Sequence, residues 1–231
     1  MRKFFRVFVI LSICLIALSA CGNDKSSKKK EDANKDKDVR VTLADVLNDK
    51  SQRKIMLAHD KGYYESPEII WAGTIGNGKV EAHPYTNYDG FTVGDVIDLS
   101  MDDYKKKLSE IDEEYRQYGK KPKKKIDFKP VPAKVLLLQS WDKQDKAQAV
   151  GLYHEGEFYD KDDEYELIGR GYDQVRMDVP KGWLGLAMQE EDKKQPYFLY
   201  VEAKDNESSF ELDNIEKTKK KYKDVEVYKE K

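Results

Sequence analysis

The chain has little cysteine and little histidine, and this limits the chemistry open to it. Its 231 residues include two cysteines, Cys14 and Cys21, and three histidines, His59, His83 and His154. Two cysteines cannot build the disulfide framework that holds many small secreted domains together. The folded part of the chain must therefore be stabilised by packing.

The sequence motifs of common catalytic and nucleotide-binding sites are absent as well. There is no Gly-x-Ser-x-Gly, no His-Glu-x-x-His, no phosphate-binding loop and no Rossmann glycine triplet. Two isolated Gly-x-Gly pairs, at 76–78 and 169–171, are better explained as turns. We therefore predict that the protein is not an enzyme and that it binds no cofactor.

No apolar stretch is long enough for a permanent membrane span. The most apolar one, residues 7–17, is much shorter than the roughly 20 residues that a transmembrane helix needs. It follows a basic head that carries Arg2, Lys3 and Arg6 and has no acidic side chain. A basic head followed by a short apolar core is typical of a secretory signal.

Leu18, Ser19, Ala20 and Cys21 come directly after this core and resemble the lipobox of bacterial lipoproteins. The resemblance covers only the first 21 residues. It implies that the lipoprotein signal peptidase recognises Leu18-Ser19-Ala20 and cuts before Cys21, whose thiol carries a diacylglyceryl group. Since each buried CH₂ contributes about 0.8 kcal/mol, two acyl chains hold a protein at a membrane stably. The alternative is an ordinary secretory signal with a chance cysteine.

Cleavage before Cys21 leaves no thiol for catalysis or for a cysteine metal site. The Lys-rich remainder resembles uncharacterised surface lipoproteins of Gram-positive bacteria, so we expect it on the extracytoplasmic face of the cell membrane, with lipoprotein-processing enzymes among its partners. Loss of Arg2, Lys3 and Arg6 changes the formal net charge from −2 to −5. Without a basic bias, nucleic acid is not an expected partner.

Composition divides the chain into five segments. Residues 1–20 are the signal peptide, and residues 21–38, rich in lysine and aspartate, are expected to be a disordered tether. Residues 121–132 are rich in lysine and proline and are a candidate linker between an α+β subdomain at 39–120 and a β-rich subdomain at 133–231. The predicted fold is α+β, mainly antiparallel sheet with two prominent helices, as one unit or as two small subdomains.

The apolar spacing predicts where these elements lie. Residues 100–119 carry a stripe at intervals of three and four behind the cap Ser100, and we expect this stripe to pack on a sheet rather than on a partner helix. A capping box at Ser208 and Glu211 predicts a last helix that reaches Tyr222. A short helix is expected at 42–47, and strands at 54–59, 68–74, 79–83, 134–141, 148–154, 165–169, 173–179, 183–188, 197–203 and 225–228.

The tryptophans Trp71, Trp141 and Trp183 are the candidates for an aromatic binding surface. All three lie in apolar stretches, so core packing is the default interpretation. If one of them is exposed, Trp183, which follows Gly182, is the best candidate for a binding patch.

Two patterns could suit a metal ion. His83 follows Glu81 by two residues in a predicted strand, so both side chains face one side of the sheet, and a distant histidine could complete a site. The acidic residues 160–166 offer oxygen ligands for calcium, but Tyr165 stands where an EF-hand needs its sharp-turn glycine. A surface histidine and a solvated turn explain these patterns better, and we predict no metal.

Three functions remain open. The first, which we predict, is a membrane-anchored, non-enzymatic domain that binds an envelope protein, an envelope polymer or another ligand. The second is a solute-binding component of a transporter, although the chain is short for two large lobes. The third is an envelope hydrolase whose site, built from Asp or Glu pairs, matches no known motif.

Overall fold

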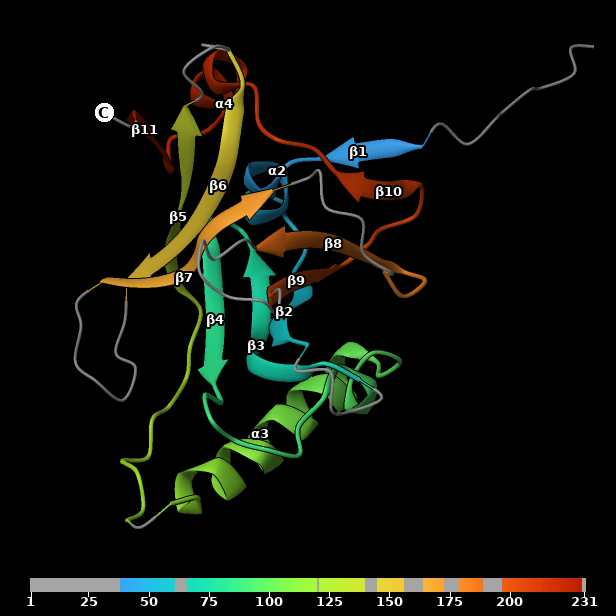
Figure 1. Cartoon of the computed structure of the whole chain (residues 1–231), viewed down its shortest axis with the longest axis vertical. Coiled ribbons are helices and arrows are strands. Elements are labelled where there is room, and N and C mark those ends of the chain that lie inside the picture. Colours follow the sequence, from blue (N-terminus) through green and yellow to red (C-terminus); the bar gives the residue numbers. More distant parts are fainter. Residues whose placement is uncertain are drawn as a thin grey trace, which may run out of the picture. The chain divides into compact units, whose positions relative to one another are not determined.

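Antiparallel strands make up most of the ordered chain. The computed structural model describes residues 38–60, 66–119, 121–139, 145–155, 164–172, 179–188 and 197–229. Figure 1 shows these strands with accompanying helices, which confirms the predicted α+β class. The helices are α2 (Leu43–Leu47), α3 (Met101–Gln117) and α4 (Ile215–Lys221), and a 3-10 turn, η1, spans Val93–Asp95.

The main sheet has nine strands in the order β11-β5-β4-β3-β2-β9-β8-β7-β6. Their bounds are β2 Arg53–His59, β3 Glu68–Gly76, β4 Lys79–Pro84, β5 Val131–Gln139, β6 Ala147–Glu155, β7 Glu164–Tyr172, β8 Trp183–Met188, β9 Tyr197–Glu202 and β11 Val225–Lys229. Separately, β1 (Val39–Val41) and β10 (Glu207–Phe210) form a parallel pair.

β5 closes the sheet into a ring, because it pairs with β4 and then β11 along one edge and with β6 along the other. Near its start β5 pairs with β4, and farther along it pairs in parallel with β11, where Val135 lies opposite Val225. The N–H groups of Ala133 and Val135 donate to residues next to β4 and β11 respectively, so both strands lie on one edge. β6 occupies the other edge. The strands from β2 to β9 therefore form a ring of pairings, with its two shortest junctions at β4–β5 and β7–β8.

Apolar side chains are buried on both faces of the curled sheet. Ile55 and Leu57 of β2 belong to an inner cluster to which β3, β4, β5, β6, β8 and β9 also contribute. Met56 and Ala58 point the opposite way, into an outer cluster beneath α3. This division follows from the strand geometry, in which successive side chains point to opposite faces.

The helix α3 covers part of the outer face as the sequence predicts. The Ser100 hydroxyl caps it by accepting a bond from the N–H of Asp103 at 3.2 Å. Its buried residues keep the predicted spacing and are Tyr104, Leu108, Ile111 and Tyr115. The stripe packs against β2 and β3, and Figure 1 shows α3 at the end of the sheet toward which β4 runs. Within the described residues, no helix has the length and apolarity needed to span a bilayer.

The prediction of a helix starting at Ser208 is wrong. Residues 207–210 form β10, which pairs with β1 and buries Phe210 in the inner cluster. The helix α4 begins later, where the Asn214 side chain accepts a bond from the N–H of Lys217 at 3.0 Å. Pairing and burial of Phe210 outweigh the local capping preference, as tertiary contacts often do.

Strands from both sides of the predicted linker at 121–132 belong to the same ring. β2, from the 39–120 segment, lies between β3 and β9, and β9 comes from the 133–231 segment. Both segments also contribute to the inner cluster. Residues 122–130 have no regular structure, and β5 begins at Val131.

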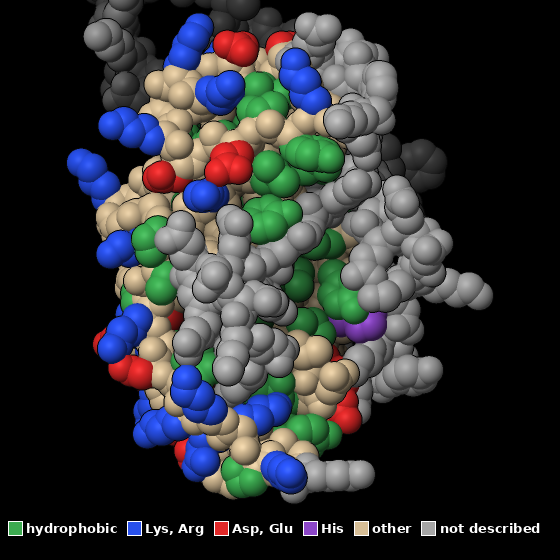
Figure 2. Space-filling view, turned by 90° about the vertical axis from the view of Figure 1, so that its left-hand side faces the viewer, with side chains coloured by type: hydrophobic (Ala, Val, Ile, Leu, Met, Phe, Trp, Pro, Cys, Tyr) green, Lys and Arg blue, Asp and Glu red, His purple; other side chains and the backbone are tan. Residues whose placement is uncertain are grey.

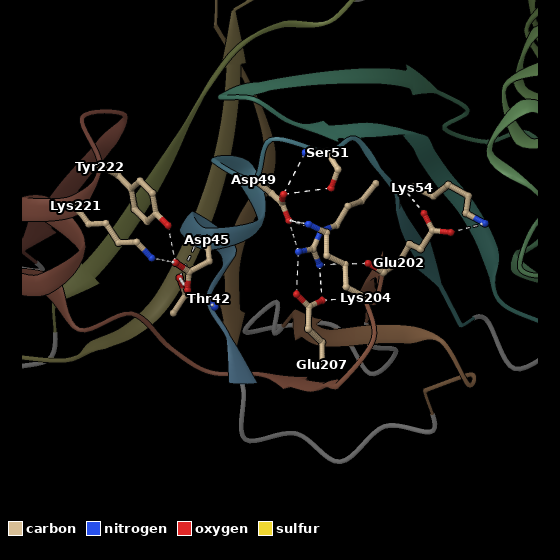
Figure 3. Close-up of polar contacts among 11 residues, drawn as sticks. Thr42, Asp45, Asp49, Ser51, Lys54, Glu202, Lys204, Glu207, Lys221 and Tyr222 are labelled. Atoms are coloured by element: carbon tan, nitrogen blue, oxygen red, sulfur yellow. Dashed lines mark hydrogen bonds and ion pairs between the residues drawn. The ribbon is translucent and has the colours of Figure 1, made fainter. Parts of the chain in front are cut away.

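Buried ion pairs fasten the chain around β2 (Figure 3). The Arg53 guanidinium lies 2.5 Å from carboxylate oxygens of both Asp49 and Glu207. Next to it, the Lys54 ammonium lies 2.9 Å from Glu202. Because each of these charges has an opposite charge within bonding distance, the cluster is a structural clamp rather than a reactive site.

Candidate functional site

The clearest hollow on the described part of the molecule lies between α3 and the segment that follows it. Residues 121–130, called the strap from here on, connect α3 to β5. A cavity of about 490 Å³, called the α3 groove, separates the strap from the helix. Glu81 and His83 of β4 line it from the sheet, Asp112 and Arg116 from α3, and Phe128 from the strap.

His83 is held at the base of the α3 groove by two carboxylates. Its Nδ1 lies 2.8 Å from Asp112 Oδ2 and its Nε2 lies 3.1 Å from Glu81 Oε1. Since ionised carboxylates only accept hydrogen bonds, this arrangement favours the protonated ring, in which both nitrogens donate. Burial opposes the charged ring, but the bonds to Asp112 and Glu81 outweigh it and raise the pKa of His83 above its ordinary value.

Neighbouring groups fix this arrangement. The Tyr85 hydroxyl donates to the second oxygen of Asp112 at 2.9 Å, so the carboxylate has little freedom to turn. The Phe128 ring packs against His83, with ring centroids 4.5 Å apart. The guanidinium of Arg116 pairs with Glu113 one turn away, with its Nε 3.0 Å from the carboxylate. The α3 groove therefore presents charges of both signs at defined positions.

The metal site that the spacing of Glu81 and His83 left open does not fit this geometry. The two side chains do meet, as the strand spacing predicts. Each ring nitrogen of His83 already faces a carboxylate oxygen at hydrogen-bond distance, which leaves no room for a metal ion between them. No group of three or more His, Cys, Asp or Glu in the described part of the chain is arranged to hold a metal ion.

A second hollow, of about 410 Å³, lies on the other side of the strap and is called the seam cavity here. Residues 125–128 line both hollows. The seam cavity opens beside the short β4–β5 junction and is also lined by Ala82, Val131 and His154. Its charged lining is mainly basic, with Lys124, Lys125 and Lys129 against Asp127.

Backbone and side-chain contacts fasten the strap to the body. The N–H of Lys123 donates to the carbonyl oxygen of Arg116 at 2.8 Å, and the Lys123 ammonium lies 3.0 Å from the centroid of the Tyr115 ring. Farther along, Phe128 packs against the inner cluster. The strap therefore has a defined position on the folded unit, with a hollow on each side of it.

Trp183 is buried, as the default interpretation has it, so the condition for a binding patch at Trp183 is not met. Trp183 is 7% exposed and belongs to the outer cluster. Its indole N–H donates to the carbonyl oxygen of Ile97 at 3.1 Å, and the Lys54 ammonium lies 5.3 Å from its ring centroid. The Trp183 ring is therefore occupied in packing beneath η1 and α3. Trp71 is buried too, as predicted.

Several predicted residues lie outside the part of the chain that the structure describes. These are the lipobox Leu18-Ser19-Ala20-Cys21, Trp141, and the strand at 173–178 with most of the acidic cluster at 160–166. Sequence reasoning singled out Glu81 and His83 but missed Asp112 and Phe128. Asp112 follows Ile111 of the buried stripe, a signal that could have placed it beside the sheet.

Comparisons with known proteins give no relative for this geometry. No protein-family model, no curated protein and no solved structure matches the chain. The function must therefore be argued from the residues themselves.

Proposed function

We propose that this chain is a lipoprotein held at the extracytoplasmic face of the cell membrane by lipid on Cys21, and that its folded unit binds a ligand without transforming it. The sequence Leu18-Ser19-Ala20-Cys21 supports the anchor. The observation that carries the binding role is the α3 groove, a concave hollow of about 490 Å³ with fixed charged groups.

The bonding of His83 favours binding over hydrolysis. A general base must offer an unprotonated nitrogen or oxygen to the substrate. Both nitrogens of His83 contact carboxylates, those of Glu81 and Asp112, so neither nitrogen is offered to a substrate in this arrangement. These three side chains bond to one another, with a net charge of −1 when the ring is protonated, and shape the groove instead.

A solute-binding component of a transporter is the second candidate. The volume of the α3 groove falls within the roughly 300–1,000 Å³ typical of small-molecule sites. A small polar solute with both charges would meet Arg116 and Asp112 on the α3 wall of the hollow. A ligand-induced rise in the melting temperature would favour this candidate over a polymer or protein partner.

The anchor is tested by replacing the lipid-bearing cysteine. Cys21→Ala should abolish incorporation of labelled palmitate and leave uncleaved precursor, or release the protein from cells. Cys14→Ala is the matched control, since Cys14 lies inside the signal, and its labelling should be normal. If the Cys21→Ala protein is still labelled, the anchor proposal fails.

The binding site is tested by photo-cross-linking on intact cells, followed by mass spectrometry. Position 113 lines the α3 groove, whereas position 110 lies on the same helix outside the lining residues. Glu113 and Glu110 have similar side-chain exposure, 57% and 53%, so a photo-reactive residue at each makes a matched pair. Capture of one ligand at position 113 alone supports the site. Equal capture at both positions, or none at either, contradicts it.

A further inference from the structure

The strap is one of two strongly basic segments of the described chain, the other being residues 217–223 at α4, which hold five lysines and no acidic residue. Between residues 121 and 129 it contains five lysines and one aspartate, a net charge of +4 in a protein whose formal net charge is −2. The five lysines are Lys121, Lys123, Lys124, Lys125 and Lys129. The strap is therefore positive although the chain as a whole is slightly negative, and it creates a positive field on one side of the molecule.

One of these lysines has an ion pair within the strap itself. Asp127 pairs with Lys129 at 2.7 Å, and both side chains are mostly exposed. Lys121 and Lys125 have no ion-pair partner among the described residues. Figure 2 looks onto the side of the molecule where the strap runs, and Lys and Arg side chains lie over both the lower and the upper part of this face.

The cavity beneath these lysines has the form of a site. Ala82, Phe128 and Val131 give it apolar walls, and Lys124 and Lys125 stand on exposed positions of its strap-side edge. The charges converge on a hollow of about 410 Å³ rather than spreading over a flat face. Three lysines outnumber Asp127 in its lining, and a cleft with apolar walls and mainly one sign of charge concentrates counter-ions of the opposite sign.

We infer that the seam cavity and the strap bind an anionic polymer that carries repeated phosphate groups. This inference rests on the proposed binding function and names the ligand class for the strap. The charged lining holds lysines and no arginine, and lysine ammonium groups bind phosphate as point charges. Lysines spaced along an irregular segment suit a chain of successive charges better than a single small anion, and release of counter-ions drives such binding.

The apolar residues of the strap favour a polymer over a membrane surface. Segments that lie on membranes insert exposed apolar side chains between the lipid headgroups. Ile126 and Phe128 are half-buried, and Phe128 packs on the inner cluster, so neither is presented outward. A membrane-bound strap would also have no use for the hollow beneath it.

The test measures binding of inorganic polyphosphate of uniform length to the full mature chain in detergent. Lys124→Gln/Lys125→Gln removes two charges from the seam cavity. Lys219→Gln/Lys220→Gln removes two exposed charges from α4, away from the cavity, and is the matched control. We expect the first variant to bind about tenfold more weakly and to lower the slope of log affinity against log salt by about 2, one for each lysine. The control should bind within about twofold of the parent chain.

Several outcomes would overturn the inference. They are no polyphosphate binding by the parent chain, equal losses in both variants, or equally tight binding of poly-L-glutamate of matched charge. Binding to vesicles of anionic lipid that depends on Lys124 and Lys125, without polyphosphate binding, would assign the strap to a membrane instead. A negative result here leaves palmitate labelling and cross-linking at position 113 unaffected, so it is distinguishable from failure of the proposed function.

Discussion

At the scale of single residues, Arg53 shows how a charge can be part of the core. It is 4% exposed, and its guanidinium donates to Asp49 and Glu207, which come from segments on either side of β2. The neighbouring carboxylates raise the pKa of Arg53 against the opposing effect of burial, so it stays charged. Its removal would leave the largely buried Glu207 carboxylate without its cation and Asp49 with the Lys204 ammonium alone.

We therefore expect Arg53→Met to lower the free energy of unfolding by about 3–5 kcal/mol, measured by urea denaturation. Lys106→Met is the control, because Lys106 is 77% exposed at the side chain and lies 4.0 Å from Glu110. Exposed pairs contribute less than about 1 kcal/mol, so the control should change little. If the free energy of unfolding falls by a similar amount in both variants, the ion pairs of Arg53 stabilise the fold no more than an exposed pair does.

Asp213 is a buried carboxyl that works against the fold at neutral pH. Burial raises its pKa from 3.8 to about 6, although bonds from Thr42 and Thr218 oppose the rise. Between pH 4 and 6 the folded state then binds more protons than the unfolded chain, so the free energy of unfolding falls as pH rises through this window. Asp213→Asn keeps an acceptor for the Thr218 hydroxyl, now 3.0 Å away, and removes the charge.

The expected result for Asp213→Asn is a rise of about 1–3 kcal/mol in the free energy of unfolding at pH 7. The loss of stability between pH 4 and 6 should become shallower than in the parent chain. Urea denaturation over a pH series measures both. A variant less stable than the parent at pH 7 would mean that the carboxylate has a partner worth more than its burial costs.

His83 gives the same sign of pH dependence as Asp213, but at higher pH. Its folded pKa is raised, so the stability it contributes is complete below its ordinary pKa of about 6.5 and is lost as pH rises through the folded value. Asp112→Asn should lower the pKa of His83, read from the ring chemical shifts in an NMR titration. Ser109→Ala, on the same wall of the α3 groove, should leave that pKa in place. An unchanged pKa in the Asp112→Asn variant would contradict the ion pair.

At the scale of elements, the sequence could predict α3 but not what its side chains touch. Spacing and the Ser100 cap are local signals, and both held. The bonds of Tyr104 were not foreseeable, because its hydroxyl accepts from the N–H of Gly73 at 3.0 Å and donates to the carbonyl oxygen of Ile55 at 2.9 Å. Those groups belong to β3 and β2, far from α3 in the sequence.

Tyr104→Phe removes one oxygen and leaves two buried backbone groups without that partner. We expect the free energy of unfolding to fall by about 1–3 kcal/mol, measured by thermal or urea denaturation. Tyr118→Phe, near the end of the same helix and 43% exposed, is the control and should be close to neutral. If Tyr104→Phe is also neutral, the hydroxyl does not hold α3 to the sheet.

The same contrast explains which parts of the candidate site were predictable. Glu81 and His83 could be placed on one face because strand geometry is local. Asp112 and Phe128 join them only through the packing of α3 and the strap, which no local pattern encodes. The lysines of 121–125 were visible as a linker, but the hollow beside them exists only because β4 and β5 diverge.

At the scale of the whole molecule, the ring makes the two sequence halves depend on each other. Residues 39–120 expressed alone should remain unfolded, because β2 would lose β9 and the inner cluster would lose most of its members. Circular dichroism and amide dispersion in NMR spectra measure this. The full chain should unfold in one calorimetric transition with equal van't Hoff and calorimetric enthalpies. A folded 39–120 fragment would support two separate subdomains instead.

The parallel pairing of β11 with β5 also sets an order in time. Synthesis runs from the N-terminus, so Val135 cannot pair with Val225, nor Ile55 with Val201, until those later residues have been made. Pairings between such distant residues slow folding, because the chain loses the entropy of closing a long loop before the new contacts stabilise it. Because β11 completes the sheet, the chain cannot finish folding until its synthesis is almost complete. A secretion channel must receive the exported protein proposed here before it has folded.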